Sequence, residues 1–433
     1  MPAHPSEPSD RQAEIASYAF RFGPLAQREF RLLFTGQLVS LLGTAVAPIA
    51  LAFGVLDLTG SESDLGFVLA ASWVPQLVLI LLGGVLADRL PRHLVMVGSN
   101  VVSGAAQGAI AFLFLSGNAR VWHLLALQAV RGAAVAFFLP ASQGLVPETV
   151  PRCLLQPANV LLGMSRNGTT ILGAALGGAL VAASSPGWAL AFDAGTYLVS
   201  AVVLSGMRLP ARAATLRPPN VLRELSEGWS EFVSRRWLWT GVLAAGIGNL
   251  AWVGGSSVYG PIVAKLSLGG AAAWGAVSAS EGAGLLLGGV LLLRYRPRRP
   301  LFAGIAALAT TALPLIFLAS LRSTPVIAAG FLVSGSALEL FNASWATVLQ
   351  QHVPLEKLSR VSSYDALGSF VFIPLGLTAA GPVAAAIGLT HALWAAAAVV
   401  AASLLAALAV RDVRELPRKD DLPPPETALE VAG

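Results

Sequence analysis

The stretch GGVLADRLPRHLV, residues 83–95, places Asp88, Arg89 and Arg92 within five positions, between two long apolar runs. Only 12% of the 433 residues are charged, whereas a soluble domain has about a quarter. Hydrophobic residues make up 55% of the chain. The composition therefore predicts a membrane protein in which this charged stretch is a short loop between two spans.

The apolar runs on both sides of this loop are long enough to cross a bilayer. Leu65–Ala87 and Leu94–Ala119 contain no charged residue, and each exceeds the roughly 18 residues that mark a membrane-span candidate. Similar runs predict an all-α polytopic membrane protein with about twelve spans, at 32–56, 65–87, 94–117, 121–145, 163–185, 188–207, 238–262, 268–293, 301–321, 325–349, 363–386 and 390–410. The stretch AAGPVAAAIG is expected to separate the last two.

The basic residues predict the orientation of these spans. If both termini are cytoplasmic, only Arg120, Lys265 and Arg322 face outside, while Arg131 and Arg166 lie within spans. All other basic residues then lie inside, as the positive-inside rule requires. We therefore expect a multi-pass protein of the inner or plasma membrane. The basic excess faces the lipid bilayer, so no nucleic-acid partner is expected, and the first thirty residues contain no signal peptide.

The spans group into two halves. We expect a cytosolic tail at 1–30, a six-helix bundle at 31–207, a cytosolic linker at 208–237, a second bundle at 238–410 and a tail at 411–433. In the linker, apolar residues at helical spacing predict an amphipathic helix on the inner membrane surface, although a plain linker helix fits equally well. These residues are Val221, Leu222, Leu225, Trp229, Phe232 and Val233.

The halves repeat each other weakly. GGVLADRLPR at residue 83 is echoed by GGVLLLRYRPRR at residue 288, at the end of the second span of each half. Two six-span halves in the same orientation imply a parallel repeat about an axis along the membrane normal. In transporters this arrangement places a binding cavity at the midplane between the halves.

The loop at 83–95 resembles the signature G-x-L-A-D-R-x-G-R-K of the major facilitator superfamily (MFS). Five positions match, and Pro91 and His93 replace glycine and lysine; the matches are Gly84, Leu86, Asp88, Arg89 and Arg92. GQLVSLLGTAVAPIALAFGVLDLTGS, WALAFDAGTYLVSA and RVSSYDALGSF are similar to bacterial exporters of the enterobactin-exporter and macrolide-efflux kind. The resemblance covers nearly the whole chain. It implies the MFS fold, with Gly84, Asp88, Arg89 and Arg92 as a conformational latch; the alternative for the arginines is simple anchoring inside.

No phosphate-binding G-x-x-x-x-G-K-[ST] motif occurs, so transport is expected to be passive or driven by an ion gradient. Ionisable residues at membrane depth then become informative, because burying each is costly. Arg131 resembles an arginine that superfamily antiporters use in the fourth span, whereas Thr44 stands where many relatives carry an acid. Our candidates for proton coupling are Arg131, Glu281, Glu339, Asp365 and Asp193, with Glu281 and Glu339 favoured. Structural hydrogen bonds or ion pairs are the alternative for each acid.

The fifth span contains GTTILGAALGG, which resembles the exporter motif G-x-x-x-x-G-P-x-x-G-G of this superfamily. Four glycines match and Ala174 replaces the proline; they are Gly168, Gly173, Gly177 and Gly178. The resemblance implies a tight seal that favours export, and plain close packing of helices is the alternative. Polar and aromatic candidates for the substrate cavity are Gln37, Asn249, Trp252, Asn342 and Trp345.

These features together predict a secondary active transporter that exports a hydrophobic or amphipathic small molecule, such as an antibiotic, drug or siderophore, by proton-coupled antiport. The alternatives are a nutrient importer or uniporter of the same fold, or a non-transporting membrane sensor. The histidines and acids form no nucleophile–base or metal cluster in the sequence, so an enzyme, a cofactor and a bound metal are not expected. The expected partners are the small-molecule substrate, protons and the lipid bilayer, and the expected state is a monomer.

Overall fold

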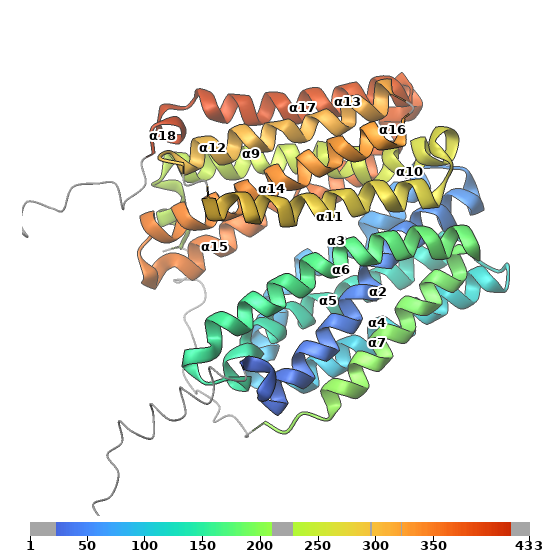
Figure 1. Cartoon of the computed structure of the whole chain (residues 1–433). Helices are drawn as coiled ribbons and strands as arrows, with labels where there is room; N and C mark the ends of the chain where they lie inside the picture. Colours follow the sequence, from blue (N-terminus) through green and yellow to red (C-terminus); the bar gives the residue numbers. More distant parts are fainter. Residues whose placement is uncertain (1–22, 210–227, 295–296, 322, 417–433) are drawn as a thin grey trace, which may run out of the picture. The chain divides into compact units, whose positions relative to one another are not determined.

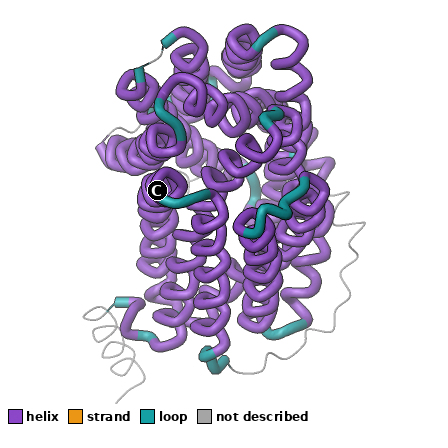
Figure 2. The backbone as a smooth tube through the Cα atoms, turned by 90° about the vertical axis from the view of Figure 1, so that its right-hand side faces the viewer, coloured by secondary structure: helices purple, strands orange, loops and turns teal. Residues whose placement is uncertain are grey.

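A computed structural model describes residues 23–209, 228–294, 297–321 and 323–416. At 80–89 and at positions 152, 293, 355, 356, 359 and 360 it describes the backbone alone. Long helices joined by short loops account for nearly all described residues, and none of them lies in a strand (Figure 2). Ten described helical segments are long and apolar enough to cross a membrane. They correspond to every predicted span except the second and fifth, which form the helices α3 and α6.

The chain divides into two compact units, residues 1–60 with 71–216, and residues 61–70 with 217–433. The first unit contains six long helices, of which α3 also supplies residues 61–70 to the second unit. They are α2 (Arg28–Thr59), α3 (Glu62–Arg89), α4 (Arg92–Leu115), α5 (Val121–Thr149), α6 (Leu155–Ala183) and α7 (Pro186–Ser205). Helix α7 packs lengthwise against α2 and α4, and α6 packs against α2 (Figure 1).

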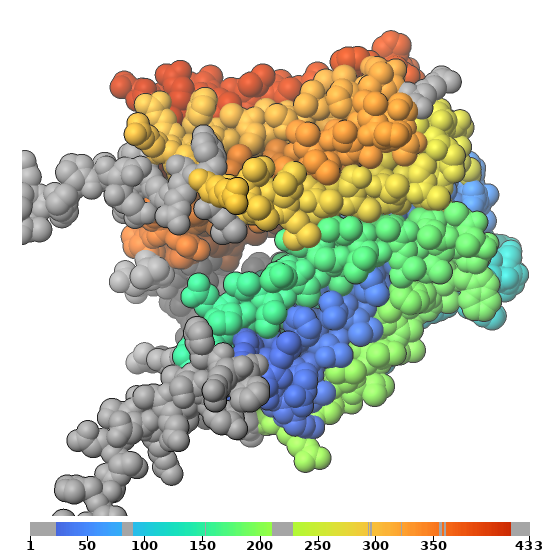
Figure 3. All heavy atoms as spheres, in the orientation of Figure 1, coloured from blue at the N-terminus to red at the C-terminus, as the bar shows by residue number. Residues whose placement is uncertain are grey.

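The second unit repeats this pattern with more interruptions. Its elements are α9 (Arg236–Val253), α10 (Gly260–Val263), α11 (Ala271–Arg294), α12 (Pro300–Leu308), α13 (Ala312–Ser320), α14 (Thr324–His352), α15 (Leu355–Phe370), α16 (Ile373–Ile387), α17 (Leu389–Ala409) and α18 (Arg411–Arg414). Helix α17 packs against α9 and α13, and α12 packs against α14. Helices α11 and α14 run side by side (Figure 3).

The internal packing of the two units follows the same order. In the first unit α2 packs on α7 and α6, and in the second α9 packs on α17 and on α15 with α16. The pairs α4–α7 and α4–α5 correspond to α13–α17 and α12–α14. Equivalent helices therefore make equivalent contacts within each unit, as a repeat of the two halves requires, and the parallel orientation of the halves stays a prediction.

Helix ends lie where glycine permits a left-handed backbone. Gly60 ends α2 with φ 64°, and its N–H donates to the Leu56 carbonyl. Gly388, with φ 81°, separates α16 from α17. It is the last residue of the AAGPVAAAIG stretch, whereas Pro382 of that stretch lies inside α16. Since residues with a Cβ avoid positive φ, glycine at these two points fixes the loop positions.

The seventh span contains two π-helical turns. After α9 the chain forms a π turn at Gly254–Tyr259, the short α10, and a second π turn at Ala264–Leu268. Close packing surrounds the first of them: a Cβ on Gly254 would lie 2.8 Å from the Gly376 carbonyl oxygen, and one on Gly260 would overlap the Trp274 ring. The wider turns thus lie against neighbouring helices of the same unit.

Candidate functional site

Arg92 is the charged residue of the loop at 83–95 whose side chain the structure describes. Its guanidinium donates a hydrogen bond to the Gly144 carbonyl oxygen and lies 3.1 Å from the Glu148 carboxylate, both near the end of α5. A Cβ on Gly144 would overlap the guanidinium, so a side chain at this position would displace Arg92 from its place on α5. Arg92 therefore joins the start of α4 to the end of α5. Gly84, Asp88 and Arg89 lie in the part of α3 whose side chains are not described, so the latch stays a prediction.

A charged cluster occupies the interior of the first unit. The Arg131 Nε on α5 donates to the Gln128 side-chain oxygen at 2.9 Å. The Arg131 guanidinium also acts electrostatically on Asp193 of α7, which is fully buried. Neither carboxylate oxygen of Asp193 has a hydrogen-bond partner among the described residues. The structure thus brings together two of the five proton-coupling candidates, and it leaves the acid without direct hydrogen bonds.

Helix α2 closes this cluster from the opposite side. The hydroxyl groups of Thr44 and Tyr197 lie 2.9 Å apart. A Cβ on Gly43 would lie 2.6 Å from Asp193 Oδ1 and would overlap the Thr196 hydroxyl. That hydroxyl donates to the backbone carbonyl of Asp193 at 2.7 Å. Gly43 allows α2 to approach Asp193 closely. The surroundings of the Asp193 carboxylate therefore contain little besides helix backbone and hydroxyl groups.

Glu281 and Glu339 lie on the packed pair α11 and α14 of the second unit. A Cβ on Gly335 would overlap the Glu281 backbone carbonyl, and one on Gly288 would lie 2.9 Å from the Glu339 Cβ. Both side chains are partly exposed, and neither forms an ion pair with a described residue. The two favoured acids therefore lie on one helix pair, free of the structural ion pairs considered as the alternative.

Asp365 and Trp345 lie together, although the sequence assigned them to different roles. The Trp345 indole N–H donates to Asp365 Oδ2 at 2.9 Å. The indole also packs edge-on against Trp237, with ring centroids 5.9 Å apart, and a Cβ on Gly241 would lie 2.5 Å from it. The structural hydrogen bond considered for Asp365 is thus present, and the buried Trp345 ring is held from three sides.

The remaining cavity candidates occupy different environments. The Asn249 amide donates to the Ser369 carbonyl at 2.9 Å, and the Trp252 ring lies 5.7 Å from Phe331. Gln37 is almost fully buried in α2, whereas Asn342 on α14 is exposed. A cavity formed by all five candidates involves both units and stays a prediction.

The exporter glycines divide into two groups. A Cβ on Gly173 would overlap Ala45 Cβ and lie 2.9 Å from the Leu42 carbonyl oxygen, and one on Gly177 would lie 3.0 Å from the Val46 carbonyl oxygen. Gly173 and Gly177 therefore allow α6 to lie against α2. Gly168 has no atom within 4 Å of its Cβ position, and Gly178 is buried. Close packing within the first unit accounts for Gly173 and Gly177 but not for Gly168.

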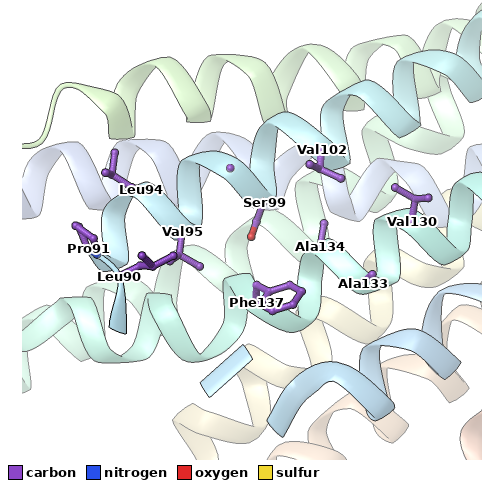
Figure 4. Close-up of a pocket in the computed structure, with 11 residues that line it drawn as sticks. Leu90, Pro91, Leu94, Val95, Ser99, Val102, Val130, Ala133, Ala134 and Phe137 are labelled. Carbon is purple, nitrogen blue, oxygen red and sulfur yellow. The ribbon is translucent and has the colours of Figure 1, made fainter. Parts of the chain in front are cut away.

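The first unit also contains an open apolar pocket of about 530 Å³ between α4 and α5, and several of its lining side chains are exposed. Its described lining is apolar except for Ser99, whose hydroxyl faces Phe137 (Figure 4). The other lining residues are Leu90, Pro91, Leu94, Val95, Gly98, Val102, Val130, Ala133 and Ala134. The volume lies within the range of small-molecule sites, about 300–1,000 Å³. None of the five cavity candidates lines it.

The described end of the linker is attached to α15. Residues 228–233 are helical, and the rings of Trp229 and Phe232 lie 5.4 and 6.0 Å from Tyr364. Glu231 accepts from Lys357 and from Arg235, each at 2.6 Å. These hydrogen bonds, chiefly that from Lys357, lower the pKa of Glu231. Of the six amphipathic residues, Val221, Leu222 and Leu225 lie outside the described residues.

Substituting Glu231 with glutamine is expected to loosen this attachment. The ion pairs are partly exposed, so we expect a loss of about 1 kcal/mol, or roughly fivefold in hydrogen-exchange protection of residues 228–236. Because the pKa of Glu231 is lowered, its contribution is complete above the ordinary carboxyl pKa and is lost as the pH falls through the lowered value. Glu415→Gln, which alters an exposed pair on α18, is the control, and equal protection in Glu231→Gln and wild type would contradict the assignment.

The repeated helical units and the ten described segments long and apolar enough to cross a membrane are typical of a polytopic transporter fold. The sequence profile of the Major Facilitator Superfamily matches residues 33–377, and the chain belongs to this superfamily. It is therefore a multi-pass membrane transporter, as the resemblance of the charged loop implied.

Relatives of known name support this placement. An uncharacterized MFS-type transporter, YfiS of Bacillus subtilis (strain 168), is 28% identical over 84% of this chain and 89% of that protein. Macrolide efflux protein A of Streptococcus pyogenes is 21% identical over 90% and 98% of the two chains. The multidrug efflux pump Tap of Mycolicibacterium fortuitum is 28% identical over 86% and 92%. The similarity thus extends over nearly the full length of each relative.

A solved structure shows the same fold. A mutant form of the nucleoside transporter NupG has a TM-score of 0.72 and 13% identity, covering 88% of this chain and 99% of that chain. At this identity the likeness concerns the fold alone.

Several residues at the site were not singled out by the sequence. Gln128 and Tyr197 surround the Arg131–Asp193 cluster, Glu148 pairs with Arg92, and Gln107 is fully buried on α4. For Gln128, Tyr197 and Gln107 the available signal was weak: an uncharged polar residue in a span that otherwise reads as apolar. Only the packing of one helix on another shows which of these residues face an acid.

Proposed function

We propose that the protein exports a hydrophobic or amphipathic small molecule by exchange for protons. The observation that carries this proposal is a set of acids within predicted spans that form no ion pair with a described residue, Glu281 and Glu339 on α11 and α14, together with the buried Asp193, on which Arg131 acts. A buried carboxyl that binds and releases a proton can couple the proton gradient to a conformational change. Relatives named as efflux proteins favour export over uptake.

The proposed substrate class follows from the apolar lining of the pocket between α4 and α5. This pocket offers one hydroxyl group in an apolar lining, which suits the apolar part of an amphipathic molecule better than a sugar or nucleoside. Macrolides and amphipathic dyes are suitable first probes, because relatives are named for macrolide and multidrug efflux.

We further propose that both termini are cytoplasmic, since this orientation places the basic loops inside, and that the transporter acts as a monomer.

Replacing both favoured acids tests the proton coupling. In everted membrane vesicles an imposed proton gradient should drive accumulation of a substrate found by resistance screening. Glu281→Gln and Glu339→Gln should each reduce this accumulation, and the double variant should abolish it, because glutamine cannot bind and release a proton. The exposed Asp412→Asn on α18 serves as the matched control. If all three acid variants transport like wild type, these two acids do not couple transport to protons.

The direction of transport is tested in the same vesicles. Accumulation in everted vesicles corresponds to export from cells, and loss of preloaded substrate would instead favour an importer. Transport that is indifferent to the proton gradient would favour a uniporter.

A further inference from the structure

Two fully buried polar side chains in the first unit lack hydrogen-bond partners. Asp193 on α7 and Gln107 on α4 each have an exposed fraction of zero. Neither the Asp193 carboxylate oxygens nor the Gln107 amide atoms have a partner among the described residues. An unpartnered buried polar group costs about 1–3 kcal/mol, and an unpartnered charge costs more. Two such groups in one helix pair indicate a site that takes a polar ligand.

The packing of α4 on α7 places these two side chains at the same level. Asn100 donates to the Ser200 hydroxyl at 2.8 Å. Beyond this bond, a Cβ on Gly104 would lie 3.2 Å from Tyr197 Cβ, and one on Gly108 would lie 3.7 Å from Ala194 Cβ. The two helices are therefore antiparallel: contacts move to lower residue numbers on α7 as they move to higher residue numbers on α4. Seven residues are about two helical turns, so Gln107 lies on the same face as Asn100, and Asp193 on the same face as Ser200.

The charged groups near Asp193 and Gln107 determine which ligand can bind between them. Arg131 of α5 is a cation that acts on Asp193, and Tyr197 of α7 is the other titratable neighbour. From α2 the neighbours are Gly43 and Thr44, which do not titrate. A metal cation next to Asp193 would be repelled by Arg131. Water is uncharged and meets no such repulsion, and buried water typically hydrogen-bonds to buried polar groups that lack other partners. A proton removes the buried charge of the carboxylate when it binds.

We propose that Asp193 and Gln107 form a proton- and water-binding site in the core of the first unit. In the charged state a water molecule bridges the Gln107 amide and the Asp193 carboxylate. A hydronium ion delivers a proton to a carboxylate oxygen, an O–H bond forms on Asp193, and one water molecule is released. Asp193 holds the proton, and Gln107 is the positioning residue that stabilises the charged form. The use of this site in transport rests on the proposed proton coupling, whereas its titration does not.

The titration is tested on the purified full-length protein in detergent by infrared difference spectroscopy, which detects the C=O stretch of a protonated carboxyl. Asp193→Asn should remove one titrating band. Gln107→Met, which keeps the shape and removes the amide, should move the midpoint of that band by about half to one unit to higher pH, because a hydrogen bond contributes about 0.5–1.5 kcal/mol. A band that persists in Asp193→Asn would overturn the proposal.

Asn100→Leu is the matched control, since it removes an amide two turns away whose partner is Ser200. It should lower the thermal midpoint and leave the titration of the carboxyl unchanged. If Gln107→Met instead titrates like wild type, the Gln107 amide does not solvate Asp193 and the proposal is wrong. If Gln107→Met is more stable to heat than wild type and the midpoint of the carboxyl band is unchanged, the proposal is also wrong. That result would show that the Gln107 amide binds no water beside Asp193.

Transport measurements separate this site from the proposed function. In proteoliposomes, Gln107→Met should shift the pH profile of proton-driven transport in step with the infrared midpoint. If wild-type transport does not respond to a proton gradient, the proposed antiport fails, and the infrared result still decides whether the site exists. If transport is proton-driven while the pH profile of Gln107→Met matches that of wild type, the antiport stands and the role of this site in it fails.

Discussion

Replacing Gly173 with leucine is expected to leave little folded protein, whereas the same change at Gly168 is expected to be tolerated. A Cβ at position 173 would overlap Ala45 and lie 2.9 Å from a backbone carbonyl of α2, and a backbone atom cannot move away as a side chain can. Overpacking typically costs about 1–3 kcal/mol, and separating two helices belongs at the upper end. Thermal unfolding in detergent and elution as a single species on size exclusion measure the loss.

Gly168 is the matched control because it belongs to the same motif and helix and has open space at its Cβ position. Equal stability of the two leucine variants would show that α2 and α6 do not pack as described. A Gly168→Leu protein that folds normally but no longer transports would assign that glycine a role in the transport cycle, in addition to the packing role of Gly173.

Replacing Arg131 with methionine should destabilise the protein, and adding Asp193→Asn should recover part of the loss. Arg131 is the cation that acts on the fully buried Asp193 carboxylate, so its removal leaves that charge without compensation. Neighbouring groups of this kind show interaction energies of about 0.5–3 kcal/mol in double-mutant cycles. The thermal midpoints of the two single variants and the double variant measure this energy.

Pairing Arg131→Met with Asp412→Asn provides the control for the cycle. Asp412 lies on α18 of the second unit, so the two effects should add to within about 0.5 kcal/mol. Additivity of Arg131→Met and Asp193→Asn as well would mean that the guanidinium does not compensate the carboxylate.

The helices could be predicted because spans depend on local properties. Long uncharged runs, the sign of the loop charges and the repeat of GGVL at the end of the second span were sufficient to place each helix approximately. The fifth span was predicted from residue 163, whereas α6 begins at Leu155, because Gln156, Pro157 and Asn159 in its first two turns resemble a loop. The break before the last span was placed in the correct stretch, and Gly388 ends the preceding helix.

The surroundings of the acids could not be predicted, because they depend on how the helices are rotated against one another. The sequence places Asp193 near the start of the span predicted at 188–207. Its position between Arg131 and Gly43 follows from the close approach of α2 to α7, which a single sequence does not specify. The same limit applies to Trp345. Its sequence context fits a residue of the substrate cavity, and it fits equally well a residue whose indole N–H donates to Asp365.

The two π turns of the seventh span give this helix a mechanical property that a regular helix lacks. An i→i+5 bonded turn contains one more residue than an α turn, and moving that extra residue along the chain rotates the residues that it passes by about 100° relative to the rest of the helix. Because hydrogen bonds exchange one at a time during such a movement, the stretch between the two π turns can rotate about the helix axis while remaining helical.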